Sequence, residues 1–467
     1  MICVMEKREG KDRFFRWELL PGIIALAWPT MLEQLLHTAV QYIDTAMVGS
    51  LGMEATAAVG STVTVNWMVG STVSAFGVGF LAIISQALGS GDIEKAKRAC
   101  AQSVTTVLAV GALFTIICLG ISGYVPVWMH VEESLRRSAS VYFFILYLPM
   151  LPRTASMIFG TVLRAAGDTR TPMRIGLGVN VLNIIMNFLF IYPSRTLTIL
   201  GTSVPVWGAG WGVAGAAAAS ALSMTAGGLA VTAALLRHPQ ISPRGIGLAP
   251  DREILIPSMR IAFPNMLQRF GTSLGYVVFA SMINALGGVA TAAHTVANTV
   301  ESAFYVPGYG MQTAAATLTG NAVGAGDEKR RRDTSRLIFL GEAIMMIVSG
   351  AALFFFAPRM VRIFIRDEAV IELGSKVLRM VALSEPFYGI AIVTEGMLQG
   401  AGKTSVPFVL NIAGMWGIRI LGTFICTRFL SGGLVSAWGC MITHNVLLFA
   451  AFFVYYLRCD WHSERTV

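Results

Sequence analysis

The first long apolar stretch of the chain, residues 22–48, contains three ionisable residues. Glu33, His37 and Asp44 are separated by four and seven residues, so they share one face of a helix with 3.6 residues per turn. A charged group at the centre of a bilayer costs roughly 2.5–3.5 kcal/mol on insertion scales, so this face should line a helix bundle or a wet cavity. A carboxylate there can be switched by a proton or a cation, which makes Asp44 a candidate for ion coupling. The alternative for all three is a structural role inside the bundle.

Two amides in a later apolar stretch could assist such a carboxylate. Asn183 and Asn187 are four residues apart in residues 174–193 and therefore lie on one helix face. Amides can donate hydrogen bonds to an aspartate or coordinate a cation through their oxygens. They also join membrane helices without any further function, so both interpretations stay open.

Other side chains are candidates for a substrate cavity or for pairing inside the bundle. Amides, methionines and aromatic residues can line an adaptable apolar cavity, and the candidates are Gln34, Gln41, Tyr147, Met282 and Met311. Further ionisable residues fall inside apolar stretches, where opposite charges usually pair: Arg153, Arg269, Glu301, Glu385, Glu395 and Arg419.

Enzyme chemistry and a bound metal are not expected. Glu33, His37 and Asp44 could in principle ligate a metal, but the chain has no HExxH motif, and its six cysteines show no ligand spacing. The run GAGKT at 400–404 lacks the earlier glycine and the strand of a phosphate-binding loop. We therefore expect no cofactor apart from a coupling proton or sodium ion.

The composition predicts an all-α integral membrane protein. Of 467 residues, 55% are hydrophobic and only 13% are charged, whereas soluble domains carry about a quarter charged residues. Apolar windows long enough to cross ~30 Å of hydrocarbon recur along the chain. They predict about twelve helices, over 22–48, 57–88, 101–125, 139–162, 174–193, 209–236, 256–285, 292–322, 337–357, 376–399, 406–428 and 434–457.

The distribution of basic residues predicts an orientation. The net charge is +9, but clusters at the N-terminus, at 95–98, at 164–174 and at 329–332 all fall on one side of the predicted membrane. The positive-inside rule then places both termini in the cytoplasm and the protein in the cytoplasmic membrane. A nucleic-acid partner is the weaker interpretation. No signal peptide is recognised, because charged residues precede the first apolar run.

The chain contains one unit twice. Pro29 and Pro264 are 235 residues apart, and the same offset relates ALGSGD at 87–92 to AVGAGD at 322–327. Two lobes of six helices in the same orientation should result, with the substrate path between them. We predict an N-terminal segment 1–20, lobes 21–236 and 256–457, a linker 237–255 and a tail 458–467. The offset places Phe279, Thr272 and Gln268 opposite Asp44, His37 and Glu33, so the ionisable face belongs to the first lobe alone.

These features resemble the multidrug and toxic compound extrusion (MATE) transporters. The stretches that carry the resemblance are 28–52 (WPTMLEQLLHTAVQYIDTAMVGSLG), 85–98, 162–173, 292–311, 320–331 and 397–408. The resemblance implies a V-shaped pair of lobes that exports drugs, often cationic, against inward protons or sodium ions. It also implies that Asp44 is the first-helix aspartate used for ion coupling.

The departures from the family pattern favour one branch. NorM-type members carry second-lobe acids where this chain has Thr272 and Tyr388, and DinF-like members carry an aspartate where it has Asn187. The looser fit to the DinF-like branch favours coupling in the first lobe. We expect a monomeric exporter in the lipid bilayer that acts on small organic compounds. The alternative is a lipid-linked oligosaccharide flippase of the same wider superfamily.

Overall fold

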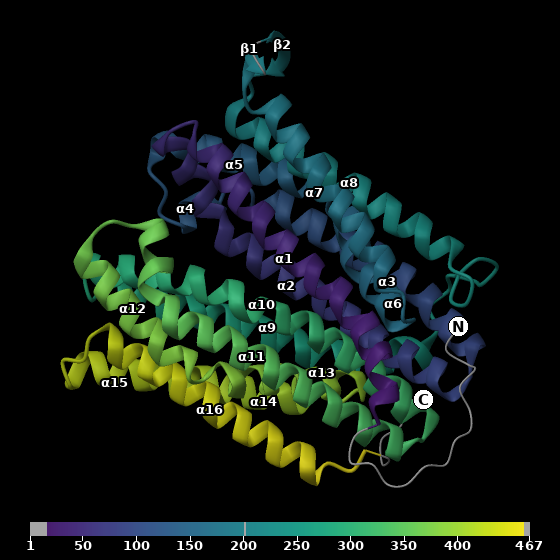
Figure 1. Cartoon of the computed structure of the whole chain (residues 1–467). Coiled ribbons are helices and arrows are strands. Elements are labelled where there is room, and N and C mark those ends of the chain that lie inside the picture. Colours follow the sequence, from purple (N-terminus) through teal and green to yellow (C-terminus); the bar gives the residue numbers. More distant parts are fainter. Residues whose placement is uncertain (1–15, 200–201, 462–467) are drawn as a thin grey trace.

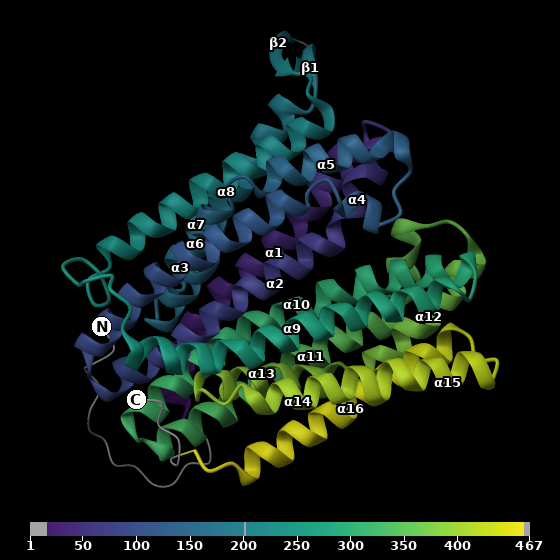
Figure 2. The same ribbon diagram turned by 180° about the vertical axis from the view of Figure 1, so that it is seen from behind.

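The computed structural model describes residues 16–199 and 202–461, and most of them are helical. Two opposite views show the helices of the first half on one side and those of the second half on the other (Figures 1 and 2). The first half comprises η1 (Trp17–Leu19), α1 (Leu20–Gly49), α2 (Met53–Ser90), α3 (Ile93–Ile121), α4 (Val125–Trp128), α5 (Glu133–Tyr147), α6 (Met150–Ala165), α7 (Arg170–Phe190), β1 (Pro193–Ile199), β2 (Thr202–Ala209) and α8 (Gly212–Arg237). The second comprises α9 (Arg252–Asn284), α10 (Gly288–Ala325), α11 (Glu328–Phe364), α12 (Glu368–Ala382), α13 (Glu385–Gly400), α14 (Ser405–Ile412), the π-helical η2 (Ala413–Ile420), α15 (Leu421–Phe429) and α16 (Leu434–Arg458).

The helices are suited to a membrane. Among the described residues, eight helical segments are long and apolar enough to span one, and the bent pairs α5–α6 and α12–α13 raise the number to ten. Helices α9 and α10, of 33 and 38 residues, complete the predicted twelve although their sequences are more polar. The predicted all-α membrane fold is confirmed. The division into lobes at 237–255 stays a prediction, and residues 238–251 form a non-helical connection between α8 and α9.

The duplication extends to breaks inside the helices. The first bent pair turns by 53° between Tyr147 and Met150, and the second by 56° between Ala382 and Glu385. Both ends of the second break lie 235 residues after those of the first. Pro149 and Pro386 stand at these breaks, as expected for residues that interrupt a helix. A proline does not interrupt every helix here, because Pro307 lies within the continuous helix α10.

The two repeated Gly-Asp motifs, at 91–92 and 326–327, form corners between consecutive helices. Gly91 and Gly326 adopt left-handed backbone angles, with φ of 81° and 68°, and end α2 and α10. The following Asp92 and Asp327 accept hydrogen bonds from the amides of Lys95 and Arg330, at 2.9 and 2.8 Å. Each corner therefore ends one helix and caps the next.

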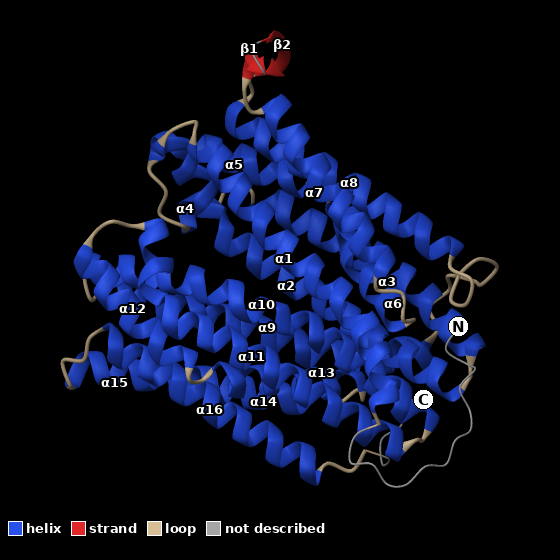
Figure 3. Ribbon diagram, in the orientation of Figure 1, coloured by secondary structure: helices blue, strands red, loops and turns tan. Residues whose placement is uncertain are grey.

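A small sheet is added to the helices. Strands β1 and β2 form an antiparallel hairpin between α7 and α8, and this hairpin projects from the helices (Figure 3). It lies away from the end where α1 begins and α16 ends (Figure 1). Those two helix ends pack in one cluster that contains Ile23 and Phe452. The hydropathy pattern does not reveal the hairpin, because it falls between two spans.

The two halves meet through a contact between equivalent residues. A side chain at Gly89 of α2 would overlap the backbone of Asn321 in α10, and one at Gly324 of α10 would overlap the backbone of Gln86 in α2. Gln86 and Asn321 are equivalent under the 235-residue offset, and so are Gly89 and Gly324. We call these four residues the glycine seam. Glycine is needed here because two helix backbones approach each other closely.

Further contacts between the halves follow the same symmetry. Helix α1 packs on α10, and α9 packs on α2. Among them, Met31 of α1 packs against Gly310 in the later half of α10, and Ser258 of α9 packs against Gly79 in the later half of α2. In the earlier halves of α2 and α10 large side chains are exposed, with Met53 at 86%, Trp67 at 62% and Val289 at 46%. The halves are thus closely packed at the seam and expose apolar side chains at the opposite ends of the same two helices.

Candidate functional site

Asp44 is held by an amide from a neighbouring helix. Asn187 of α7 donates from Nδ2 to Oδ1 of Asp44 in α1 at 2.7 Å. Asn183, one turn earlier on α7, lies beside them. With its amide turned so that its oxygen accepts from Ser220 Oγ at 3.2 Å, Asn183 Nδ2 lies 2.8 and 3.2 Å from the two carboxylate oxygens of Asp44. The structure therefore brings Asp44, Asn183 and Asn187 into one site, with Ser220 of α8 behind them.

This arrangement can bind and release a positive charge. The two amides are buried, with 6% and 1% of Asn183 and Asn187 exposed, whereas Asp44 is half-buried and therefore accessible. Amide donors stabilise the ionised carboxylate. When a proton or a cation neutralises the carboxylate, these hydrogen bonds weaken, and an amide oxygen can turn toward a cation. The site therefore links the charge of Asp44 to the contact between α1 and α7.

Glu33 takes part in a different contact. Its carboxylate lies 3.2 Å from Nη1 of Arg164 at the end of α6. The backbone oxygen of Arg164 accepts from Thr317 Oγ1 of α10 at 3.2 Å, so this residue also contacts the second half. Glu33 and Asp44 share a helix face as predicted, but eleven residues put them roughly 16 Å apart along the axis. The ion pair is a separate feature from the Asp44 site.

His37 and the predicted cavity residues are dispersed. His37 is exposed, within electrostatic range of Glu33 and Arg153. Tyr147 is fully buried beside Phe143 in the core. The remaining candidates differ in exposure: Gln34, Met282 and Met311 are half-buried and Gln41 is exposed. Met311 packs against the cluster of α1 and α10 residues between the halves. A role of these residues in substrate binding stays a prediction.

In the second half, an arginine lies beside the residue that is equivalent to Asp44. Phe279, the equivalent of Asp44, lies beneath the guanidinium of Arg419, 5.6 Å from its ring centre. Arg419 is 4% exposed and donates to Asn445 Oδ1 at 3.2 Å. Glu301 lies within its electrostatic range. Arg419 lies in the π-helical segment η2, a type of helix that is frequent at functional sites.

The contact equivalent to Glu33–Arg164 is also changed. The offset relates Glu33 to Gln268 and Arg164 to Gln399. Both glutamines donate to Glu395 Oε1 at 2.9 Å, and Asn411 donates to its other oxygen at 3.2 Å. An ion pair in the first half is thus replaced by a carboxylate that three amides surround. The hydrogen bonds of Glu395 are thus supplied by neutral donors.

Arg153, in the first half, has buried nitrogens without a hydrogen-bond partner, and its guanidinium lies over the Tyr147 ring.

The buried acids Asp333 and Glu342 are absent from the sequence-based candidates, and Glu342 is the more deeply buried. Glu342 of α11 is 0% exposed, and neither carboxyl oxygen has a hydrogen-bond partner. It packs against Gly308 and Gly389. Glu385 is 1% exposed, also without a partner, and lies within electrostatic range of Glu301 and Glu342. The sequence offered one signal for Glu342, which is its position as an acidic residue inside the apolar run 337–357. No group of three His, Cys, Asp or Glu among the described residues is arranged to hold a metal ion.

Comparisons with known proteins agree with this architecture. A family model described as MatE matches residues 29–189 and again residues 264–425, and the two matches begin 235 residues apart. A "Probable multidrug resistance protein NorM" from Thermotoga maritima is 26% identical over 96% of this chain and 95% of its own length. Human "Multidrug and toxin extrusion protein 1" is 24% identical over 95% of this chain and 75% of its own length.

Solved structures match the fold. The structure titled "Outward-facing conformation of a multidrug resistance MATE family transporter of the MOP superfamily" superposes with a TM-score of 0.85 at 23% identity, covering 95% of this chain and 96% of that one. "Crystal structure of MATE in the bent conformation" gives 0.85 at 23% identity over 94% of each chain. With the double match of the family model, the chain belongs to the MATE family of multidrug and toxin extrusion transporters.

Proposed function

We propose that this protein is a secondary active exporter of small organic compounds, often cationic, driven by inward protons or sodium ions. The observation that carries the proposal is the contact of Asp44 with Asn187 between two membrane helices, which has no counterpart in the second half. The names of relatives as multidrug resistance proteins support the substrate class. Because the acids of the NorM pattern are replaced by Thr272 and Tyr388, we propose coupling in the first lobe, nearer to the DinF-like branch.

Coupling follows from the difference in charge between Asp44 with and without a bound cation. An incoming cation neutralises Asp44, weakens its hydrogen bonds to the α7 amides and lets α1 move relative to α7. This movement favours release of the substrate on one side. When the glycine seam separates, the cation leaves to the cytoplasm and a new substrate enters. Transport is driven because each ligand binds the two conformations with different affinity.

We propose that the protein acts as a monomer in the cytoplasmic membrane with both termini in the cytoplasm. Helix α1 begins and α16 ends at the same end of the molecule (Figure 1). The basic stretches 95–98 and 329–332 follow the corners at Gly91 and Gly326, and both corners adjoin the glycine seam. On this orientation the seam closes the cytoplasmic side.

The test is dye efflux from vesicles that contain the purified protein, under an imposed proton gradient or an imposed sodium gradient. Asp44→Asn keeps the size of the side chain and removes its charge, so gradient-driven efflux should fall to the level of empty vesicles. Glu54→Gln, the same kind of change at an exposed position of α2, should export like the wild type. Equal export by Asp44→Asn would make Asp44 a structural residue. Lipid movement without dye export would favour the flippase instead.

A further inference from the structure

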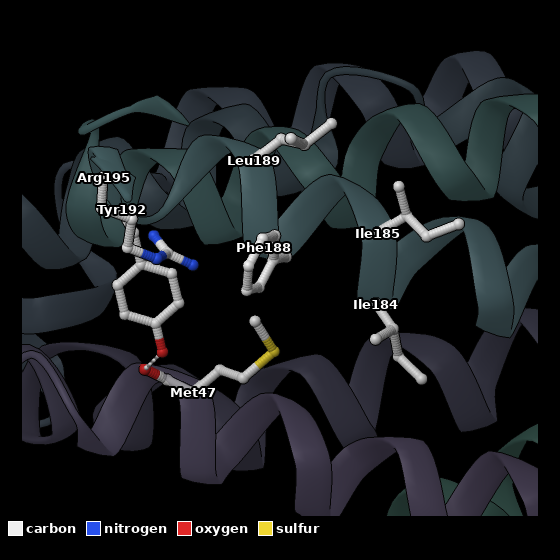
Figure 4. A pocket seen from close by; sticks show the side chains of 7 residues that line it. All are labelled: Met47, Ile184, Ile185, Phe188, Leu189, Tyr192 and Arg195. Atoms are coloured by element: carbon white, nitrogen blue, oxygen red, sulfur yellow. Dashed lines mark hydrogen bonds between the residues drawn. The ribbon is translucent and has the colours of Figure 1, made fainter. Parts of the chain in front are cut away.

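A groove lies beside the Asp44 site, between α1 and α7. Its volume is about 710 Å³, and Met47, Ile184, Ile185, Phe188, Leu189, Tyr192 and Arg195 line it. Figure 4 shows the two ends of the groove: Arg195 and Tyr192 lie at one, Ile184 and Ile185 at the other, with Phe188 between them and Met47 reaching across from α1. One end is therefore cationic and the rest is apolar.

The charge at the cationic end is available for a ligand. The guanidinium of Arg195 lies 4.1 Å from the ring centre of Phe188 and 4.3 Å from that of Tyr192. No carboxylate among residues 16–199 and 202–461 lies within ion-pair distance of it. Stacking on two rings fixes the guanidinium while its N–H donors stay free. Such a group binds phosphate oxygens well.

The groove has the orientation of a lipid in a membrane. Helices α1 and α7 are both long and apolar enough to span the bilayer. Arg195 lies five residues beyond the end of α7 at Phe190, where a spanning helix reaches the headgroup region. Trp207 and Trp211, which are 61% and 57% exposed, stand near this level, as tryptophans do at membrane interfaces. The apolar end of the groove then faces the acyl chains and the cationic end faces the headgroups.

We propose that this groove binds one anionic phospholipid, with its phosphate at Arg195 and an acyl chain along Phe188 and Ile184. The positive charge disfavours the cationic compounds proposed as substrates, and the apolar lining between two membrane helices favours an anionic lipid over a water-soluble anion. Met47 lies one turn beyond Asp44 on α1, and Ile184 and Phe188 are the neighbours of Asn183 and Asn187 on α7. The acyl chain therefore fills the space between the two helices that carry the ion site, and it sets how closely they approach. This last effect rests on the proposed export function, while lipid binding itself does not.

The first test measures binding of fluorescent phosphatidylglycerol and phosphatidylcholine to the purified full-length protein. Arg195→Gln should weaken phosphatidylglycerol binding about tenfold or more, the value of one lost charge-assisted contact. It should weaken phosphatidylcholine binding less, because the choline ammonium already neutralises the phosphate of that lipid. Arg195→Lys should retain most of the preference. Arg366→Gln, which removes an exposed arginine after α11, is the matched control. Met47→Trp should fill the groove and lower binding of both lipids. Binding that does not saturate, or an equal loss in the two arginine-to-glutamine variants, would overturn the site.

The second test measures dye efflux in vesicles of pure phosphatidylcholine and in vesicles with added phosphatidylglycerol. The wild type should be faster with the anionic lipid, and Arg195→Gln should lose that difference while it keeps the rate seen in phosphatidylcholine. The same response to phosphatidylglycerol in Arg195→Gln as in the wild type would contradict a link between the groove and the ion site. If no vesicle shows export, the proposed function fails, and the binding result still decides whether the groove holds a lipid.

Discussion

At the residue scale, Asp44 depends on amide partners that its own helix cannot supply. The spacing within residues 22–48 predicted which face of α1 points inward, and the spacing of Asn183 and Asn187 predicted a matching face of α7. The structure joins these two faces through a 2.7 Å hydrogen bond. The partner of Glu33 was not predictable, because Arg164 lies 131 residues away and local periodicity contains no information about such a distant contact.

Removal of one amide should weaken coupling without removing it. Asn187→Leu keeps the branched shape of the side chain but takes away the 2.7 Å donor, so only Asn183 can still support ionised Asp44. We expect gradient-driven efflux to fall roughly ten- to a hundredfold, because a hydrogen bond to a charged group contributes about 1.5–3 kcal/mol. Asn66→Leu removes an amide that contacts Thr62 in α2 and serves as control. A wild-type rate for Asn187→Leu would exclude a direct role of this amide.

Glu342 should be a cost to stability and not a part of the ion pathway. Its carboxyl is fully buried and has no hydrogen-bond partner. Replacement by methionine keeps the shape and removes the unsatisfied group, so Glu342→Met should stabilise the protein by about 1–3 kcal/mol. Thermal unfolding in detergent would measure this as a higher Tm. The Tm of Asp44→Asn, measured in the same way, is the comparison, because the carboxylate of Asp44 has hydrogen-bond partners and that of Glu342 has none. A loss of efflux in Glu342→Met would instead assign a transport role to this acid.

At the scale of elements, the hydropathy of the sequence predicts the membrane-spanning helices well but does not predict where a helix is interrupted. The twelve windows coincide with the long helices and bent pairs, because each must hide its backbone from lipid. The bends at 147–150 and 382–385 are marked in the sequence only by prolines, and Pro307 shows that a proline alone does not decide. The hairpin of β1 and β2 is not predicted by hydropathy, because it lies between two apolar runs and not within one.

The ion pair between α1 and α6 should hold these elements together without setting the driving ion. Glu33 and Arg164 side chains are 28% and 18% exposed, so we expect a coupling energy of about 1 kcal/mol in a double-mutant cycle of Glu33→Gln and Arg164→Gln. Thermal unfolding of the four proteins measures it. Glu33→Gln should still respond to the same gradient as the wild type. If this variant instead responds to neither gradient, Glu33 belongs to the coupling site after all.

At the scale of the whole molecule, transport requires that the glycine seam open and close. Gly89→Ala places a methyl group where the backbone of Asn321 lies, and Gly324→Ala does the same toward Gln86. Both variants should shift the protein toward a form open at the seam and lower efflux. Labelling of a cysteine introduced at Ala87, which is 0% exposed next to the closed seam, would measure the opening. Gly120→Ala, whose methyl group meets no atom within 4 Å, is the matched control. Similar labelling in all three variants would show that the seam is not a gate.

The symmetry of the seam has a consequence for how such a chain can arise. Gly89 meets Asn321 as Gly324 meets Gln86, so each half presents the same patch to the other, as the subunits of a two-fold homodimer do. A half-length ancestor could have paired with a second copy of itself before the two genes were fused. After fusion the halves were free to diverge: one half has Asp44, and the other has Phe279 at the equivalent position with Arg419 beside it. In a homodimer both subunits would carry the same residues, so an ion site in one half alone could arise only after the fusion.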